Sequence, residues 1–300
     1  MNHPQTNEVM HGLAEDFSIS GRTPILRRPD EYDMAYEDVC FPSMDGVGLE
    51  GWFIPSYSDH LVICNHCVSG NRYGYPGHLE PWTSFGGIEV NFLPMYRALH
   101  DAGYNVLAYD FRNHGLSGSG NGGIVSLGLF EYRDVIGSLR YAERRRGLSK
   151  MKTGLLSICL GCDATMVAMK RHPEEFEHVK TLLGLQPVSA RAFIEQTSEV
   201  TGDVNGVELS DKTIHPWTGI HINGLSPITD ANAVRMPTLL VQVRDEVTTK
   251  PSDAETIYDN ISAKDKKLVW IESTTRRVDG YNFLGEHPEL MLEWFKAHID

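Results

Sequence analysis

Short, continuous apolar runs alternate with amphipathic stretches along most of the chain. Continuous apolar runs bounded by turn residues are typical of strands that helices cover on both faces. Most of these runs are followed by a stretch in which apolar residues recur at helical spacing. The strands are expected at 60–66, 104–110, 152–158, 179–186, 238–245 and 267–272, and the helices at 90–102, 127–146, 164–172, 251–262 and 288–298.

This alternation predicts an α/β protein with a mainly parallel central sheet and helices on both faces. Residues 38–42 and 48–55, on either side of a Met-Asp-Gly turn, predict a hairpin at one edge of the sheet. Residues 1–35 are polar, broken by prolines and without a period, which indicates an N-terminal extension to a domain at 36–300. Residues 188–233 interrupt the rhythm and predict a small cap insertion.

Composition narrows the class of protein. The 300 residues include 40 acidic and 27 basic side chains, giving a formal net charge of -13, which disfavours nucleic acid and anionic membrane surfaces as partners. No leader-like or membrane-spanning apolar stretch is apparent, and five cysteines fit a reducing compartment, so a cytoplasmic location is expected. A homodimer, with the N-terminal extension packed on a second subunit, stays open.

One stretch carries a candidate for covalent chemistry. The apolar run ending at Ile158 passes through Ser157-Ile158-Cys159-Leu160-Gly161 into a helix-compatible segment. Small residues two before and two after a nucleophile let a strand and a helix meet in a tight turn that exposes the side chain. The helix N-terminus that follows would favour a thiolate at Cys159. The alternative is a small apolar cysteine in a buried joint.

With this turn, the chain resembles the α/β-hydrolase superfamily, and residues 154–165 look like the cysteine-containing elbow of its dienelactone hydrolase branch. The resemblance runs from about Tyr36 to the C-terminus. Residues 110–118 look like the superfamily's Asp-x-Arg-x-His-Gly-x-Ser turn, in which the histidine is structural. The resemblance to the superfamily implies an α/β-hydrolase fold, in which the acid and then the histidine follow the nucleophile along the chain.

The resemblance also indicates where the partners of Cys159 should lie. Asp245 ends an apolar run at the place of the family's acid, with Glu246 as the substitute if the register slips by one. The loop expected to hold the histidine instead contains Arg276 and Arg277, and the next imidazole is His287. His287 is therefore the working base. The alternative is an arginine that stabilises the thiolate as a fixed charge without accepting a proton.

The remaining site residues follow from the same layout. The oxyanion hole is expected from the backbone amides of Leu160 and Val68, although Cys67 stands where relatives carry glycine and narrows the allowed backbone. The long loop at 67–87 is rich in aromatic residues and is expected at the substrate entrance. The substrate-binding candidates are Arg72, Tyr73, Trp82, Arg276 and Arg277.

These residues predict a cysteine-dependent hydrolase of a small-molecule ester, lactone or thioester that works through an acyl-enzyme, with no cofactor or metal. Two alternatives stay open: an acyltransferase that uses the same cysteine, and a ligand-binding pseudo-hydrolase. Two Cys-x-x-Cys pairs, Cys64 with Cys67 and Cys159 with Cys162, offer a competing zinc or redox interpretation.

Overall fold

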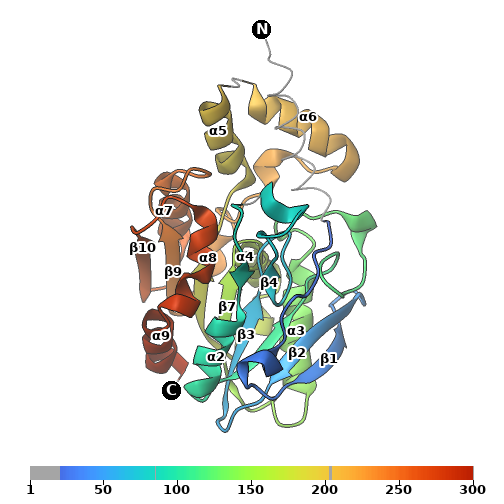
Figure 1. Cartoon of the computed structure of the whole chain (residues 1–300), viewed down its shortest axis with the longest axis vertical. Helices are drawn as coiled ribbons and strands as arrows, with labels where there is room; N and C mark the ends of the chain where they lie inside the picture. The colour runs from blue at the N-terminus through green and yellow to red at the C-terminus, as the bar shows by residue number, and fades with distance from the viewer. Residues whose placement is uncertain (1–20, 85, 203–204, 300) are drawn as a thin grey trace.

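A central sheet organises the computed structural model, which describes residues 21–84, 86–202 and 205–299 (Figure 1). The strands lie in the order β1-β2-β6-β3-β7-β8-β9-β10. Their bounds are β1 Glu37–Pro42, β2 Gly48–Ile54, β3 His60–Asn65, β6 Asn105–Tyr109, β7 Lys152–Ile158, β8 Val179–Leu185, β9 Thr238–Val243 and β10 Lys266–Ile271.

The direction of the strands agrees with the prediction. β1 and β2 form the expected antiparallel hairpin, and β2 pairs antiparallel with β6. The pairs from β6 through β3, β7, β8 and β9 to β10 are all parallel. A second small sheet pairs β4 (Gly74–Tyr75) with β5 (Val90–Asn91) inside the long loop region. The mainly parallel sheet is confirmed, and its carboxyl-terminal edge gathers the ends of β3, β7, β8 and β9.

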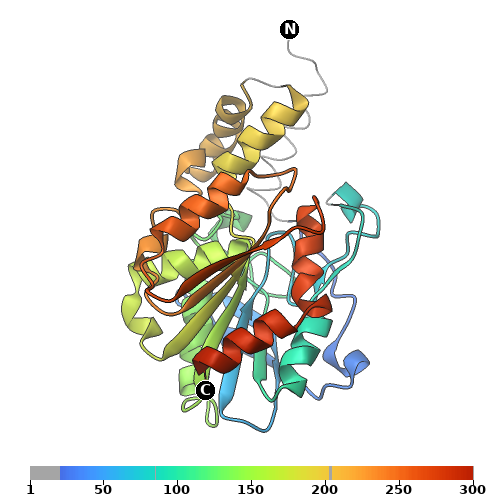
Figure 2. The same ribbon diagram turned by 90° about the vertical axis from the view of Figure 1, so that its left-hand side faces the viewer.

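Helices cover both faces of the sheet, as the turned view shows (Figure 2). α3 (Tyr132–Arg144) packs against α4 (Leu160–Arg171), and α4 contacts β3 and β7. On the other face α2 (Leu93–Asp101) contacts β6, and α9 (Glu289–Ile299) contacts β7 and β8. α7 (Pro251–Asn260) follows β9. Short 3-10 turns occupy η1 Pro29–Tyr32, η2 Trp82–Ser84, η3 Asn121–Gly123, η4 Pro173–Phe176, η5 Ile222–Gly224 and η6 Ala231–Ala233.

Between β8 and β9 the chain forms α5 (Ala190–Thr201) and α6 (Gly206–Thr218), which contact each other and η5. Figures 1 and 2 show both helices above the carboxyl-terminal edge of the sheet. Among the described residues, every helix is too short or too polar to span a bilayer.

One helix was not expected from the sequence. The sequence pattern predicts no helix between residues 262 and 288, but residues 277–286 form α8 (Arg277–Glu286). Gly280 lies inside this helix, where glycine lowers helix propensity by about 1 kcal/mol. A Cβ at Gly280 would lie 2.4 Å from Gln186 Nε2 and 2.8 Å from Val243 Cγ2. The glycine therefore lets α8 approach the ends of β8 and β9, at the cost of a weaker helical signal.

The N-terminal segment can be followed from Gly21, while residues 1–20 of the expected extension lie outside the described residues. The Arg22 guanidinium donates to the Gly115 carbonyl at 2.8 Å, and Arg27 forms an ion pair with Glu89 at 2.9 Å. The described part of the segment therefore packs on the domain itself.

Candidate active site

Cys159 stands at the turn between β7 and α4, at the carboxyl-terminal edge of the sheet. Its backbone has φ 51° and ψ -113°, which is strained for a residue with a side chain. The turn is tight because the Gly161 amide donates to the His66 carbonyl at 3.1 Å. A Cβ at Gly161 would lie 2.4 Å from the Asn65 carbonyl oxygen, so this position requires glycine. Cys159 is 2% exposed.

After β9, the buried carboxylate belongs to Glu246 and not to Asp245. β9 ends at Val243, and the turn after it leaves Asp245 exposed while Glu246 is buried. Glu246 accepts hydrogen bonds from Gln242 Nε2 at 2.7 Å and from the hydroxyls of two threonines, Thr248 and Thr249. The strand ends two residues earlier than expected, so the buried acidic side chain after it is that of Glu246, the expected substitute, while Asp245 faces solvent.

Arg277 occupies the place in which a base was sought. Its Nη1 donates to Glu246 Oε1 at 2.6 Å, and the two side chains are 3% and 1% exposed. Its Nη2 donates to the carbonyl of Gln186, a buried residue that follows β8 with φ 54°. The sequence had assigned Arg277 only to substrate binding or to a fixed charge beside the thiol.

His287 does not reach this cluster. It follows α8, ten residues after Arg277, which corresponds to about 15 Å along a helix. Its side chain is 55% exposed, lies 3.8 Å from Glu289 and packs against Phe283. The structure therefore does not bring Asp245 and His287 together beside Cys159, because Asp245 is exposed and residues 277–286 form a helix that carries the histidine away.

Tyr281 links the arginine to the sulfur, and sequence reasoning missed it. It lies one helical turn after Arg277 and receives a hydrogen bond of 2.9 Å from Arg277 Nε. The Tyr281 hydroxyl also interacts electrostatically with Cys159. Burial raises the pKa of Tyr281 well above its ordinary value, so the hydroxyl keeps its proton and can donate it toward sulfur. The Arg277-x-x-x-Tyr281 spacing would have indicated this pair had α8 been recognised.

Cys159, Glu246, Arg277 and Tyr281 form a cluster that is both charged and buried. Although burial opposes its charge, Glu246, Tyr281 and Cys159 raise the pKa of Arg277 well above its ordinary value. A guanidinium that stays protonated cannot accept a proton near neutral pH. Arg277 can therefore hold negative charge in place and orient Tyr281, but it cannot act as a general base.

Two backbone amides face no acceptor at the turn. The Leu160 amide begins α4 and so lacks an intrahelical acceptor, and neither it nor the Val68 amide donates to any residue in the described ranges.

Hydrogen bonds fix the tautomer of His66, next to Cys67. The Phe111 amide donates to His66 Nε2 at 2.9 Å, so Nδ1 carries the proton and donates to the Cys67 carbonyl at 2.7 Å. Cys67 does not take a positive φ, so a cysteine fits at this position without backbone strain.

Comparison with known proteins addresses the architecture. No family model and no curated protein matches the sequence. Solved structures match over nearly the whole chain. Esterase Pf2001 of Pyrococcus furiosus is 19% identical, covers 95% of this chain and 100% of its own, and has a TM-score of 0.69. The alpha/beta hydrolase GrgF from Penicillium sp. sh18 is 12% identical, covers 89% of this chain and 99% of its own, and has a TM-score of 0.59. This chain has the α/β-hydrolase fold.

An acetyl xylan esterase from Paenibacillus sp. R4 also shares the α/β-hydrolase fold, at 16% identity, 99% and 96% coverage and a TM-score of 0.61. At these identities the likeness concerns the fold alone. The dienelactone hydrolase branch and the cysteine nucleophile remain predictions.

Two of the predicted entrance residues are structural. Arg72 is 2% exposed, forms an ion pair with Asp110 at 3.0 Å and lies over the Trp52 ring. Tyr73 is fully buried, and its hydroxyl donates to Glu89 at 2.7 Å. Neither lines an entrance, because the loop that begins at Cys67 turns inward before it reaches the surface.

The other two candidates lie nearer the surface. Trp82 is half-buried in η2 and packs against the core. Arg276 is 52% exposed and forms an ion pair with Asp279 at 2.6 Å. Trp82 and Arg276 stay predictions as substrate-binding residues.

The zinc interpretation has no support in the described ranges, where no group of three or more histidine, cysteine, aspartate or glutamate side chains could hold a metal. Cys162, a residue of α4, points its Sγ toward β8, where a Cβ at Gly184 would lie 2.7 Å from it. Cys64 lies inside β3. The four sulfurs therefore do not converge on one point, as tetrahedral coordination requires.

Two buried carboxyl groups extend the cluster and were not expected from the sequence. Asp163, in the first turn of α4, accepts from the Val188 amide at 3.3 Å, and its Oδ2 has no hydrogen-bond partner in the described part of the chain. Burial and then Cys159 raise its pKa well above the ordinary value. Burial also raises the pKa of Asp253, which accepts from the Ser189 amide at 2.9 Å.

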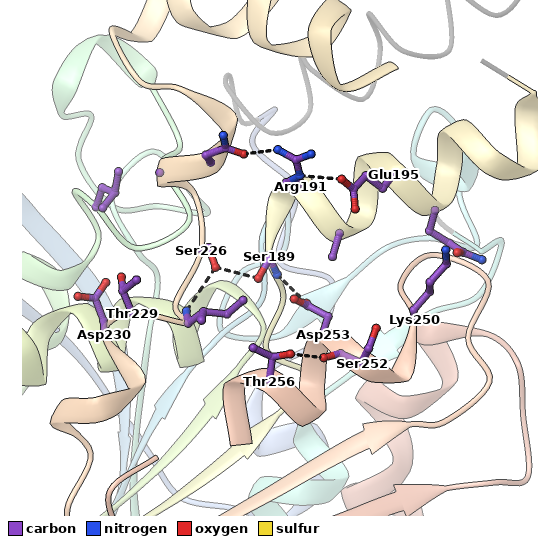
Figure 3. Close-up of a pocket in the computed structure, with 16 residues that line it drawn as sticks. Ser189, Arg191, Glu195, Ser226, Thr229, Asp230, Lys250, Ser252, Asp253 and Thr256 are labelled. Atoms are coloured by element: carbon purple, nitrogen blue, oxygen red, sulfur yellow. Dashed lines mark hydrogen bonds and ion pairs between the residues drawn. The ribbon is translucent and has the colours of Figure 1, made fainter. Parts of the chain in front are cut away.

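Asp253 lines a cavity of about 580 Å³ between α5, the segment after η5 and the start of α7 (Figure 3). This volume is in the range of small-molecule sites. Hydroxyl groups line its wall, with Ser189 and Ser226 joined at 2.8 Å. Cys159 does not line this cavity, but Arg277 acts electrostatically on Asp253. The cavity therefore lies beside the cysteine cluster and not over the sulfur.

Proposed function

We propose that this α/β-hydrolase is a cysteine-dependent acyl hydrolase whose substrate is an activated ester, lactone or thioester. The observation that carries the proposal is the strained strand-to-helix turn at Cys159, beside the buried ion pair of Arg277 and Glu246. Arg277 and Tyr281 both interact electrostatically with the sulfur. A buried cysteine that served packing alone would need neither the strain nor the polar partners. Esterases among the solved structures of the same fold support an acyl substrate.

In this mechanism the Cys159 sulfur attacks the carbonyl carbon, and the carbonyl π electrons move onto oxygen. The free amides of Leu160 and Val68 hold that oxyanion. Collapse of the tetrahedral intermediate re-forms the carbonyl, breaks the bond to the leaving group and leaves a thioester on Cys159. The step starts from the thiolate, and Arg277 keeps a fixed positive charge that interacts with the reacting sulfur.

The partners of Cys159 also limit the leaving group. Tyr281 can donate a hydrogen bond, but its raised pKa makes it a weak acid. Leaving groups that depart as stable anions, such as thiolates and phenolates, therefore suit the site better than alkoxides or amines. Thioesters and aryl esters are the expected substrates.

The same observation favours acyl transfer as a second candidate. Water needs a base to attack the acyl-enzyme, and Arg277 cannot supply one. An acceptor that is already nucleophilic, such as an amine or a thiol, needs less help. Release of the acyl group is therefore expected to be slow in water and faster when such an acceptor is added.

The test uses a p-nitrophenyl ester and an aryl thioester in rapid-mixing experiments on the full-length protein. The wild-type protein should release a burst of about one leaving group per site, followed by slow turnover that hydroxylamine accelerates. Cys159→Ala should abolish the burst, and the exposed Cys40→Ala should leave it unchanged. Unchanged turnover in Cys159→Ala would overturn the proposal. Saturable binding with no burst would instead support the pseudo-hydrolase.

A further inference from the structure

Cys67 and Cys159 occupy facing positions at the ends of two paired strands. β3 and β7 are parallel, with Asn65 opposite Ser157. Each cysteine lies two residues beyond this last pair, so continuing the register would place the two cysteines opposite each other, and their sulfurs interact electrostatically. The strands stay together here, because the Asn65 and Ser157 side chains hydrogen-bond at 2.8 Å and the Gly161 amide reaches the His66 carbonyl at 3.1 Å.

This placement meets the first requirement for a disulfide. Neighbouring strands lie about 4.8 Å apart, and bridged cysteines have Cα atoms about 4.4–6.8 Å apart. Both thiols are free and buried, at 3% and 2% exposure for Cys67 and Cys159. They also share their surroundings, because Arg277 and Tyr281 each interact electrostatically with both sulfurs.

We propose that Cys67 and Cys159 form a redox-active dithiol that a peroxide converts to a disulfide. The Cys159 thiolate attacks one peroxide oxygen, the O–O bond breaks, and Cys159 becomes a sulfenic acid while water or an alcohol leaves. The Cys67 sulfur then attacks the oxidised sulfur and expels the hydroxyl group, which leaves as water with the Cys67 proton. The two thiols lose two electrons and the peroxide gains them. An external dithiol reverses the change.

Cys67 is also well placed to take the second step. Burial raises the pKa of the Cys67 thiol, and a charged Cys159 raises it further. Oxidation of Cys159 removes that negative charge while Arg277 remains. Cys67 is therefore a poor competitor for the peroxide but becomes a better nucleophile once Cys159 has reacted.

The other buried cysteines are less suited to this role. Cys64 precedes Asn65 in β3, and adjacent strand residues point to opposite faces. The Asn65 side chain reaches Thr165 of α4, so Cys64 points to the other face of the sheet. Cys162 Sγ lies under α4 against β8. The pairing of Cys67 with Cys159 also gives the unusual cysteine at position 67 a chemical role.

The test treats the full-length protein with hydrogen peroxide and follows thiols instead of turnover. The wild-type protein should lose two of its five titratable thiols, and a non-reducing peptide map should show one link, between Cys67 and Cys159. Dithiothreitol should restore both thiols. Cys67→Ala should instead accumulate a sulfenic acid that dimedone traps at Cys159, whereas Cys162→Ala, the matched control, should still form the disulfide.

Two results would overturn the proposal. One is equal dimedone trapping in the wild-type protein and in Cys67→Ala, and the other is a Cys159–Cys162 link in place of the expected one. Cys67→Gly provides a second variant if Cys67→Ala does not fold, as circular dichroism would show. Because the readout is thiols and peptide links, the dithiol can fail while acyl-enzyme formation succeeds, and the reverse also holds.

Discussion

The buried ion pair between Arg277 and Glu246 predicts an asymmetric response to mutation. Arg277→Met keeps most of the side-chain volume but removes the guanidinium, leaving the Glu246 carboxylate buried with threonine and glutamine donors alone. It also removes the donor to the Gln186 carbonyl. Glu246→Gln removes the counter-ion of a buried guanidinium in turn. Breaking such a pair from one side costs about 3–5 kcal/mol.

Removing both charges together should cost much less. In the double variant that combines Arg277→Met with Glu246→Gln, the amide carbonyl introduced at position 246 can still accept from Gln242 or Thr249, and no unpaired charge remains. A coupling free energy of about 2–3 kcal/mol is therefore expected between the two sites.

Urea unfolding, followed by circular dichroism at neutral pH, measures the free energy of unfolding for all four proteins. For a domain of this size, each single variant should also lower Tm by roughly 5–15 °C. Strictly additive losses, with a coupling near zero, would refute the assignment of Arg277 and Glu246 as a buried charge pair. A double variant less stable than both single variants would do the same.

Three further predictions follow from single positions. Gly161→Ala would place a Cβ 2.4 Å from the Asn65 carbonyl oxygen, so we expect lost acylation and a lower Tm, and wild-type values for both would contradict the tight turn. Burial raises the pKa of Asp163, so its contribution to the free energy of unfolding is complete below the unfolded pKa of about 4 and falls as pH rises above it. In urea unfolding, Asp163→Asn should therefore exceed the wild type in stability by more at pH 9 than at pH 5. Against the effect of burial, the Arg112 guanidinium lowers the pKa of Asp45 to about 2. The contribution of Asp45 to the free energy of unfolding is therefore lost as pH falls from about 4 through 2. Asp45→Asn should make the free energy of unfolding depend less on pH over that interval.

The architecture could be predicted because its signals are local. Buried parallel strands read as continuous apolar runs, and β7 has the bounds that its pattern predicted. The elbow was visible because Ser157 and Gly161 flank Cys159 at fixed spacing. These features depend on neighbouring residues and hardly at all on the rest of the fold.

The partners of Cys159 could not be predicted in the same way. Their identity depends on a turn after β9 that differs by one residue from the expected register, and on α8, whose Gly280 conceals the helix. Gly280 packs against Gln186, far away in the sequence, so its reason is tertiary. Arg277 and Tyr281 were for that reason not recognised as a pair.

Intact-protein mass spectrometry after a short reaction with an aryl thioester tests the central claim most directly. The wild-type protein is expected to gain the mass of one acyl group, which peptide mapping places on Cys159 and hydroxylamine removes. Tyr281→Phe, which keeps the ring but loses the hydroxyl that interacts with Arg277 and with the sulfur, should form the same adduct more slowly. An unmodified wild-type protein that still turns over the thioester, or an adduct equally abundant in Cys159→Ala, would contradict the account.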